Sequence, residues 1–197
     1  MAKLYFRYGA MNSGKTTSLI QVAFNYEERG MHVLLIKPKI DTKGDNMLVC
    51  RIGVKRKVDF LADSSQNIYD YVNAQHEKSA VHCVLTDESQ FFSRAQIDEL
   101  FHVAVELNIP VICYGLRTDF LMNGFEGSVR LLEIAHTVEE LKTICECGKK
   151  AMINARQVDG KYVFSGAQVA IDKVDRVEYR ALCPECYFRI KNKTEGK

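Results

Sequence analysis

At 197 residues, the chain is long enough for one domain of ordinary size, or for a core domain with a small appendage. Apolar residues make up 47% and charged residues 26%, as in soluble globular proteins, and a net charge of +2 gives no strong attraction to nucleic acids or membranes. No apolar run is long enough for a signal peptide or a membrane span, so we expect a cytoplasmic protein without a nucleic-acid or membrane partner.

Over the first two-thirds of the chain, short apolar runs alternate with segments of helical periodicity. We expect strands at 3–8, 33–36, 81–85 and 110–114, and helices from a glycine-containing loop to about 29, at 65–75 and at 95–107. The run 81–85 is almost wholly apolar, as in a strand that is buried on both faces of a parallel sheet. This alternation predicts an α/β fold with a parallel sheet and flanking helices.

A phosphate-binding loop (P-loop) of the form G-x-x-x-x-G-K-[ST] lies between the first strand and the first helix, which is the context that the motif requires. Its residues are Gly9, Ala10, Met11, Asn12, Ser13, Gly14, Lys15 and Thr16. Backbone N–H groups would face the phosphates, Lys15 would reach the β- and γ-phosphates, and the Thr16 hydroxyl would bind Mg²⁺. The sequence therefore predicts that a RecA-like sheet binds ATP with Mg²⁺.

Two carboxylates, Asp87 and Glu88, follow the buried strand 81–85 at its C-terminal end. Parallel sheets bind their ligands at that edge, so Asp87 is the expected Mg²⁺ ligand and Glu88 a candidate general base. The pair alone leaves two reactions open, because Glu88 could activate water for hydrolysis or take a proton from an acceptor hydroxyl.

The cysteines fall into two groups. Cys83 and Cys113 lie in apolar runs and are expected to be buried, while Cys50 is isolated. The other four form a C-x-C and a C-x-x-C pair with 35 residues between the pairs: Cys145, Cys147, Cys183 and Cys186. Four thiolates from two turns suit one closed, structural zinc site; two pairs of incidental thiols are the alternative.

The character of the sequence changes after about residue 140. We expect a P-loop α/β domain at 1–141 and a small zinc-binding domain at 142–197, the latter β-like and ending in a frayed, charged tail over 191–197. A domain this short needs a metal because apolar burial alone would hardly stabilise it.

The P-loop, the segment Asp87-Glu88-Ser89-Gln90-Phe91-Phe92 and the two cysteine pairs together resemble the type II thymidine kinases, and specifically their bacterial branch. The likeness extends over nearly the whole chain. Lys37-Pro38 with Asp41-Thr42, Arg51-Ile52-Gly53 and the segment 114–120 also resemble segments of that family.

The resemblance implies transfer of the γ-phosphoryl group of ATP to the 5′-hydroxyl of thymidine, with Glu88 as proton acceptor and with Asp87 and Gln90 on the nucleotide–Mg²⁺ side. It also implies a lasso-like loop between the zinc-binding ends, which covers the nucleoside. The residues that it assigns to thymidine are Met11, Leu116, Phe120, Phe125, Val169, Ala170, Ile171, Asp172 and Tyr179. A homotetramer and feedback inhibition by thymidine triphosphate are further implications.

Two departures from the family pattern concern substrate contacts. The segment 172–179 lacks a Gly-Gly pair that many members have, and Lys43 stands where an arginine is common. A lysine cannot offer the bidentate geometry of an arginine.

Two other functions are consistent with parts of this pattern. A P-loop ATPase with a nucleic-acid-binding zinc ribbon would share the P-loop, the acid pair and the cysteines, but the near-neutral charge argues against it. A nucleotide-binding module without catalysis is the other. The aromatic residues after the acid pair, Phe91 and Phe92, are as consistent with core packing as with ligand contact.

Overall fold

A six-stranded parallel sheet with the order β5-β2-β6-β7-β1-β8 forms the centre of the protein. The computed structural model describes residues 1–39, 46–50, 53–168 and 177–196. The strands of the sheet are β1 (Leu4–Tyr8), β2 (Val33–Pro38), β5 (Phe60–Ala62), β6 (Cys83–Thr86), β7 (Val111–Gly115) and β8 (Thr137–Glu140). The predicted parallel sheet is confirmed, and it has two more strands, β5 and β8, than the sequence indicated.

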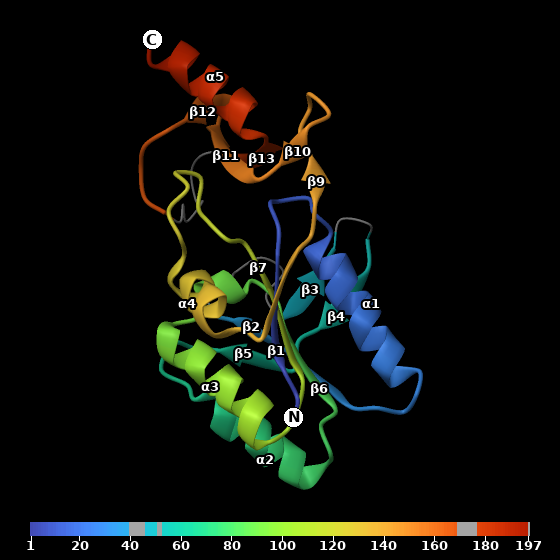
Figure 1. Cartoon of the computed structure of the whole chain (residues 1–197). Helices are drawn as coiled ribbons and strands as arrows, with labels where there is room; N and C mark the ends of the chain where they lie inside the picture. The colour runs from blue at the N-terminus through green and yellow to red at the C-terminus, as the bar shows by residue number, and fades with distance from the viewer. Residues whose placement is uncertain (40–45, 51–52, 169–176, 197) are drawn as a thin grey trace.

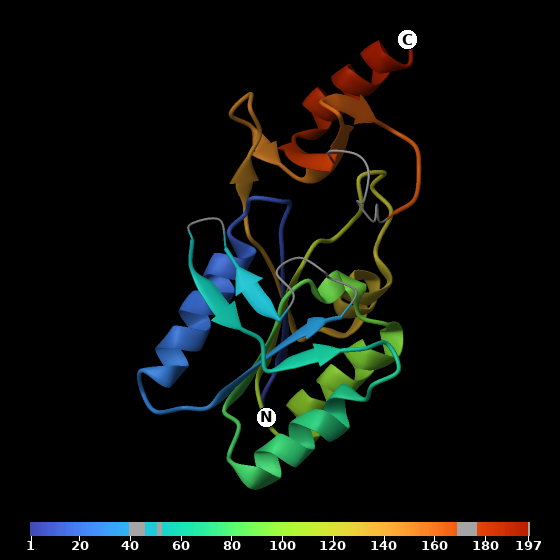
Figure 2. The ribbon, with the colours of Figure 1, turned by 180° about the vertical axis from the view of Figure 1, so that it is seen from behind.

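Helices cover both faces of the sheet because the strand residues are apolar on both sides. In β2, Leu34 and Ile36 belong to one core and Val33 and Leu35 to the other, as the two-residue period of a strand requires. One face is covered by α2 (Ile68–Lys78), α3 (Arg94–Glu106) and α4 (Glu126–Ile134), and the other by α1 (Lys15–Glu27) and the hairpin of β3 (Met47–Val49) and β4 (Lys55–Lys57) (Figures 1 and 2).

Local hydrogen bonds set where the helices begin. The predicted helix at 65–75 starts three residues later, at Ile68, because the Asn67 side chain accepts a hydrogen bond from the Asp70 N–H at 2.9 Å. Ser93 and Gln96 form a reciprocal capping box at the start of α3. Helix α4 was not predicted from the sequence; its N-cap, Phe125, makes no side-chain capping bond.

A smaller, mostly antiparallel region follows β8. It contains β9 (Thr143–Ile144), β10 (Lys150–Ala151), a three-stranded sheet of order β12-β11-β13, and α5 (Pro184–Thr194). The strands of that sheet are β11 (Ile153–Val158), β12 (Lys161–Val163) and β13 (Val177–Leu182). Figure 1 shows this region beyond the C-terminal ends of the parallel strands, on the same side as the loop that leads into α1.

The expected frayed tail over 191–197 is wrong for its first part, because α5 continues to Thr194. Cys183 caps this helix, Pro184 occupies its first turn, and Tyr187 is buried in the small core with Ile153 and Leu182. These contacts anchor the N-terminal end of α5 on the small core, and the helix continues from there through its charged last turns. The described helices include none with the length and apolar composition needed to cross a bilayer.

Candidate active site

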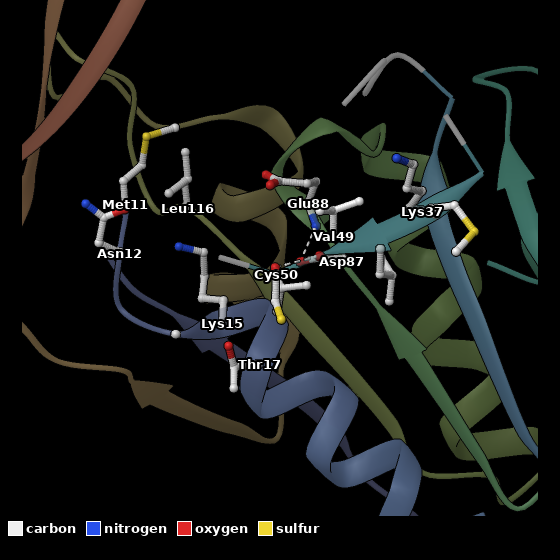
Figure 3. Close-up of a pocket in the computed structure, with 14 residues that line it drawn as sticks. Met11, Asn12, Lys15, Thr17, Lys37, Val49, Cys50, Asp87, Glu88 and Leu116 are labelled. Atoms are coloured by element: carbon white, nitrogen blue, oxygen red, sulfur yellow. Dashed lines mark hydrogen bonds between the residues drawn. The ribbon is translucent and has the colours of Figure 1, made fainter. Parts of the chain in front are cut away.

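A cavity of about 290 Å³ opens at the C-terminal edge of the parallel sheet. Figure 3 shows side chains of the P-loop on one side of it, Lys37 on the other, and Asp87 and Glu88 between them. The residues that line it are Met11, Asn12, Gly14, Lys15, Thr16, Thr17, Lys37, Met47, Leu48, Val49, Cys50, Asp87, Glu88 and Leu116.

The P-loop has the backbone conformation that its glycine content predicts. Gly14, directly before α1, has a φ of 78°, which a side chain would oppose. The Lys15 Nζ donates hydrogen bonds to the carbonyl oxygens of Gly9 and Ala10, each at 3.0 Å. The Ser13 hydroxyl is buried and has no hydrogen-bond partner among the described residues. A buried polar atom of this kind is expected to meet a ligand or an ordered water.

Thr16 and Asp87, predicted separately as Mg²⁺ ligands, lie side by side. The Thr16 hydroxyl donates a hydrogen bond to Asp87 Oδ2 at 3.0 Å. Burial and the neighbouring Glu88 carboxylate raise the pKa of Asp87 to about 7. Hydroxyl and carboxylate oxygens at the phosphate-facing end of a strand suit Mg²⁺, so the residues fit the ion that the P-loop predicts.

Glu88 has a backbone conformation that is uncommon for a residue with a side chain. Its φ is 49° and its ψ is 37°, in the left-handed region, immediately before the short 3₁₀ helix Ser89–Phe91. Strained residues of this kind cluster at functional sites, where the surrounding structure maintains them. Here the strained turn ends β6 and places the Glu88 side chain at the wall of the cavity.

Gln90 links Glu88 to Leu116, another residue of the cavity lining. The Leu116 N–H donates to Gln90 Oε1 at 2.9 Å, and Gln90 Nε2 donates to Glu88 Oε2 at 2.5 Å. Because Oε1 already accepts from a backbone N–H, the amide orientation is fixed and Nε2 must face Glu88. The Gln90 side chain, only 2% exposed, therefore joins the candidate base to Leu116 rather than lining the cavity.

The residues assigned to thymidine by resemblance lie in several places. Met11 and Leu116 line the cavity. Phe120 and Phe125 are buried and do not line it, and the Phe125 ring meets that of Phe91 edge-on, with 5.5 Å between centroids. Tyr179 lies in β13. Val169, Ala170, Ile171 and Asp172 lie outside the described residues, as does Lys43.

The structure also settles two questions of packing. Phe92 belongs to the core beneath the sheet, whereas Phe91 is partly exposed. Cys83 and Cys113 are fully buried, and burial raises the pKa of each thiol to about 12, so both remain protonated.

Sequence reasoning missed several residues of the site. Lys37, which was noted only in a segment resembling the family and was given no site role, is 1% exposed and lines the cavity from the end of β2, at the same sheet edge as Asp87. Its position after an apolar run was a usable signal. The hairpin residues Met47–Cys50 line the cavity without any motif. Asn154 was missed too, although its Oδ1 accepts a hydrogen bond from the P-loop N–H of Met11 at 2.8 Å.

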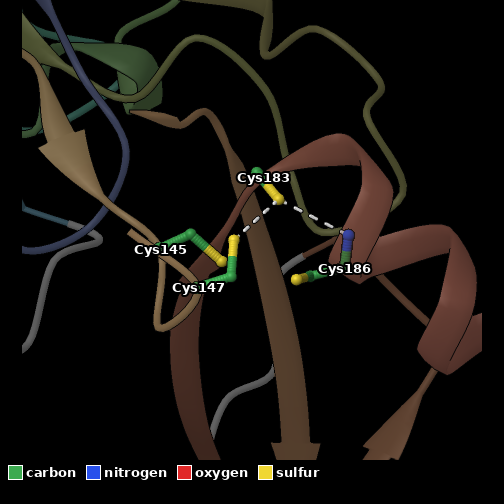
Figure 4. A group of neighbouring side chains, drawn as sticks. All are labelled: Cys145, Cys147, Cys183 and Cys186. Atoms are coloured by element: carbon green, nitrogen blue, oxygen red, sulfur yellow. Dashed lines mark hydrogen bonds between the residues drawn. The ribbon is translucent and has the colours of Figure 1, made fainter. Parts of the chain in front are cut away.

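The four paired cysteines come together in the C-terminal region (Figure 4). Their sulfur atoms all lie within 4.8 Å of one another, and those of Cys147 and Cys183 are 3.6 Å apart. A tetrahedral zinc site with Zn–S bonds of about 2.3 Å places its sulfurs about 3.8 Å apart. The cluster therefore fits one zinc ion, and the expected pairing of the C-x-C and C-x-x-C turns is confirmed.

Comparison with known proteins gives a consistent result. The family described as "Thymidine kinase" matches residues 2–187. Curated proteins named thymidine kinase from Zymomonas mobilis and Haemophilus influenzae are each 46% identical to this chain, over 98% and 93% of it and over 99% and 98% of their own lengths. One from Francisella tularensis is also 46% identical, over 87% of both chains.

Proposed function

This chain belongs to the thymidine kinase family, and we propose that Glu88 is the general base of the reaction that this membership assigns. The protein is an ATP-dependent phosphotransferase that converts thymidine to thymidine monophosphate. In the proposed step, the 5′-oxygen of thymidine bonds to the γ-phosphorus while the bond from that phosphorus to the β–γ bridging oxygen breaks. Glu88 takes the 5′-hydroxyl proton, and ADP leaves.

The proposal rests on the position of Glu88. Its strained turn and its hydrogen bond from Gln90 direct the side chain to a cavity that the P-loop also lines. The bond to Gln90 leaves the other carboxylate oxygen of Glu88 to accept a proton. Phosphoryl transfer depends mainly on positioning and charge neutralisation, so a fixed base beside the phosphate site is the arrangement that the reaction needs.

In this proposal, residues 9–16 bind the phosphate donor, ATP. Backbone N–H groups of the loop and the N-terminus of α1 bind the phosphates, and Lys15 exchanges its carbonyl contacts for phosphate oxygens. Thr16 and Asp87 would hold Mg²⁺, which would neutralise charge on the phosphates. Gln90, expected from the resemblance to belong to the nucleotide side, acts instead by orienting Glu88.

We assign the acceptor site to the region between the cavity and the C-terminal sheet. Met11, Leu116, Phe120 and Phe125 would enclose the thymine ring, and Tyr179 would support the sugar. The segment Val169–Asp172 is proposed to cover the nucleoside on the resemblance alone. In this division, residues 1–141 bind the donor, and residues 142–197 complete the acceptor site around a structural zinc.

Family resemblance supports three wider proposals: a homotetramer, inhibition by thymidine triphosphate, and a cytoplasmic location. The nucleic-acid-binding ATPase is disfavoured, because the family match covers both the P-loop and the cysteine region.

Replacing Glu88 by Gln tests the assignment of the base. Loss of general-base catalysis is expected to lower kcat by about 10²–10⁴-fold while binding of an ATP analogue is retained. Formation of thymidine monophosphate is measured beside a Glu28→Gln control, since Glu28 is an exposed carboxylate that follows α1. A Glu88→Gln enzyme with the turnover of the control would remove Glu88 from this role.

A further inference from the structure

Arg156 is a buried cation with four contacts around its guanidinium group. It lies in β11 and is only 4% exposed. Its Nε donates to the Tyr179 hydroxyl at 3.1 Å, and its two terminal nitrogens donate to the carbonyl oxygens of Ala167 and Gln168, each at 2.9 Å. Its Cζ lies 3.7 Å from the centre of the Phe120 ring.

No carboxylate balances this charge within the part of the chain that the structure describes. Arg7 and Arg130, in contrast, both pair with acidic side chains. Among the described residues, the charge is held by carbonyl dipoles, a phenol and an aromatic face. Burying a charge in this way is costly, and well-packed apolar residues often stabilise a core as much or more. Stability alone is therefore a poor reason for an arginine at this position.

The contacts of Arg156 converge on two residues of the proposed acceptor site. Phe120 follows β7 and Tyr179 lies in β13, so the two reach this point from distant parts of the sequence. The Tyr187 hydroxyl fixes the backbone of Phe120 by donating to its carbonyl oxygen at 2.9 Å. The guanidinium plane can stack on a ring while its edge donates to several acceptors, whereas a lysine ammonium cannot do both.

A second polar residue on the same strand extends this connection to the donor site. Asn154 stands two positions before Arg156, so both side chains project from the same face of β11. It accepts from the P-loop N–H of Met11 at 2.8 Å, and its amide nitrogen donates to the Thr118 carbonyl oxygen at 3.4 Å. One strand face thus contacts the P-loop and two aromatics of the proposed acceptor site, Phe120 and Tyr179.

We propose that Arg156 is a positioning residue for the nucleoside acceptor. It acts through others: its plane fixes the Phe120 ring, and its edge fixes the Tyr179 hydroxyl and the backbone at Ala167 and Gln168. The inference rests on the proposed function, because it takes Phe120 and Tyr179 as thymidine contacts. It requires that loss of Arg156 raises KM for thymidine while KM for ATP stays nearly unchanged.

The experiment compares Arg156→Met and Arg156→Lys with the wild-type enzyme and an Arg7→Met control. Arg7 also donates to a tyrosine hydroxyl, that of Tyr114 at 2.9 Å, and lies 5.8 Å from the centre of that ring, but it pairs with Glu139 and contacts none of the described residues assigned to thymidine. KM for thymidine, KM for ATP, kcat and Tm are measured for each protein. Both Arg156 variants are expected to raise KM for thymidine about tenfold or more, with KM for ATP within about twofold.

The lysine variant separates geometry from charge, since it keeps the charge but not the planar group. The Arg7 control is expected to lower Tm with little change in either KM. An unchanged KM for thymidine in both Arg156 variants, or an equal rise in the two KM values, would overturn the proposal. Failure of the wild-type enzyme to form thymidine monophosphate would instead contradict the proposed function.

A double-mutant cycle provides a second test, which can still be carried out if Arg156→Met does not fold. Tyr179→Phe removes only the hydroxyl that Arg156 contacts. When it is combined with Arg156→Lys, the effects on KM for thymidine are expected to be less than additive, because the same hydrogen bond is lost in both single variants. Strict additivity would show that the two residues act independently, contrary to the proposal.

Discussion

Replacing Gln90 by Met tests how the candidate base is held. The variant keeps the approximate volume of a buried side chain but removes its amide, and with it the bonds to Glu88 Oε2 and to the Leu116 N–H. Hydrogen bonds to charged groups contribute about 1.5–3 kcal/mol. If that stabilisation is used to orient Glu88 in the transition state, kcat should fall by about 10–150-fold.

The two KM values distinguish this role from the one that the family resemblance implies. If Gln90 orients Glu88, its replacement lowers kcat and leaves KM for ATP nearly unchanged. If Gln90 binds the nucleotide or Mg²⁺, its replacement raises KM for ATP instead. Steady-state formation of thymidine monophosphate at varied ATP and at varied thymidine measures both.

Replacing Gln90 by Glu adds a test with a defined sign. The new carboxylate can still accept from the Leu116 N–H, but it faces the Glu88 carboxylate where an amide donated before. Two such groups compete for one proton, and the pair loses its last proton only at higher pH. The acid limb of the kcat–pH profile should therefore move upward by about one unit or more. A normal kcat in Gln90→Met, or a profile unmoved in Gln90→Glu, would refute the reasoning.

Three further outcomes are expected. Metal analysis should find about one zinc per chain, and chelation should unfold the C-terminal region before the parallel sheet; a thermal transition unaffected by the chelator would contradict this. Gly127→Ala should lower the free energy of unfolding, measured in urea, by roughly 1–3 kcal/mol, because the new Cβ would lie 2.6 Å from the Ser89 carbonyl oxygen. Gly124→Ala is the control and should cost less, because there the new Cβ meets only a side-chain methyl group. Arg56→Met should destabilise the protein by about 0.5 kcal/mol at pH 7, compared with exposed Lys55→Met. Arg56 lowers the pKa of Glu27, so this difference should vanish in denaturant titrations as the pH falls through that pKa; a constant difference would contradict the pairing.

The central fold could be predicted because its signals are local. The strands at 33–36 and 81–85 are apolar on both faces, and the P-loop marks the turn between β1 and α1. The strand β5 is apolar but only three residues long, β8 is mostly polar and partly exposed, and the N-cap of α4 is a phenylalanine without a side-chain capping bond. The helix α5 was missed because Cys183 was interpreted only as a metal ligand, although it also caps a helix with Pro184 in the first turn.

The donor half of the site was predicted better than the acceptor half. The P-loop and the pair Asp87-Glu88 are contiguous motifs, and the structure brings them together at one cavity. Asn154 and Arg156 gave no such signal: in a strand with alternating residues, polar side chains normally face solvent, and only the tertiary structure shows that these two face inward. Their roles depend on contacts between segments that are distant in sequence.

The P-loop of this protein is completed by residues that the ribosome adds more than a hundred positions later. A Cβ on Gly9 would lie 2.4 Å from the Leu141 carbonyl oxygen, Thr143 donates to the Asn12 carbonyl oxygen, and the Met11 N–H donates to Asn154. During synthesis, the first 140 residues can build the parallel sheet before these partners exist. The loop that we propose binds ATP therefore reaches its final form only when the region proposed to complete the thymidine site is being made, so the two halves of the proposed active site mature together.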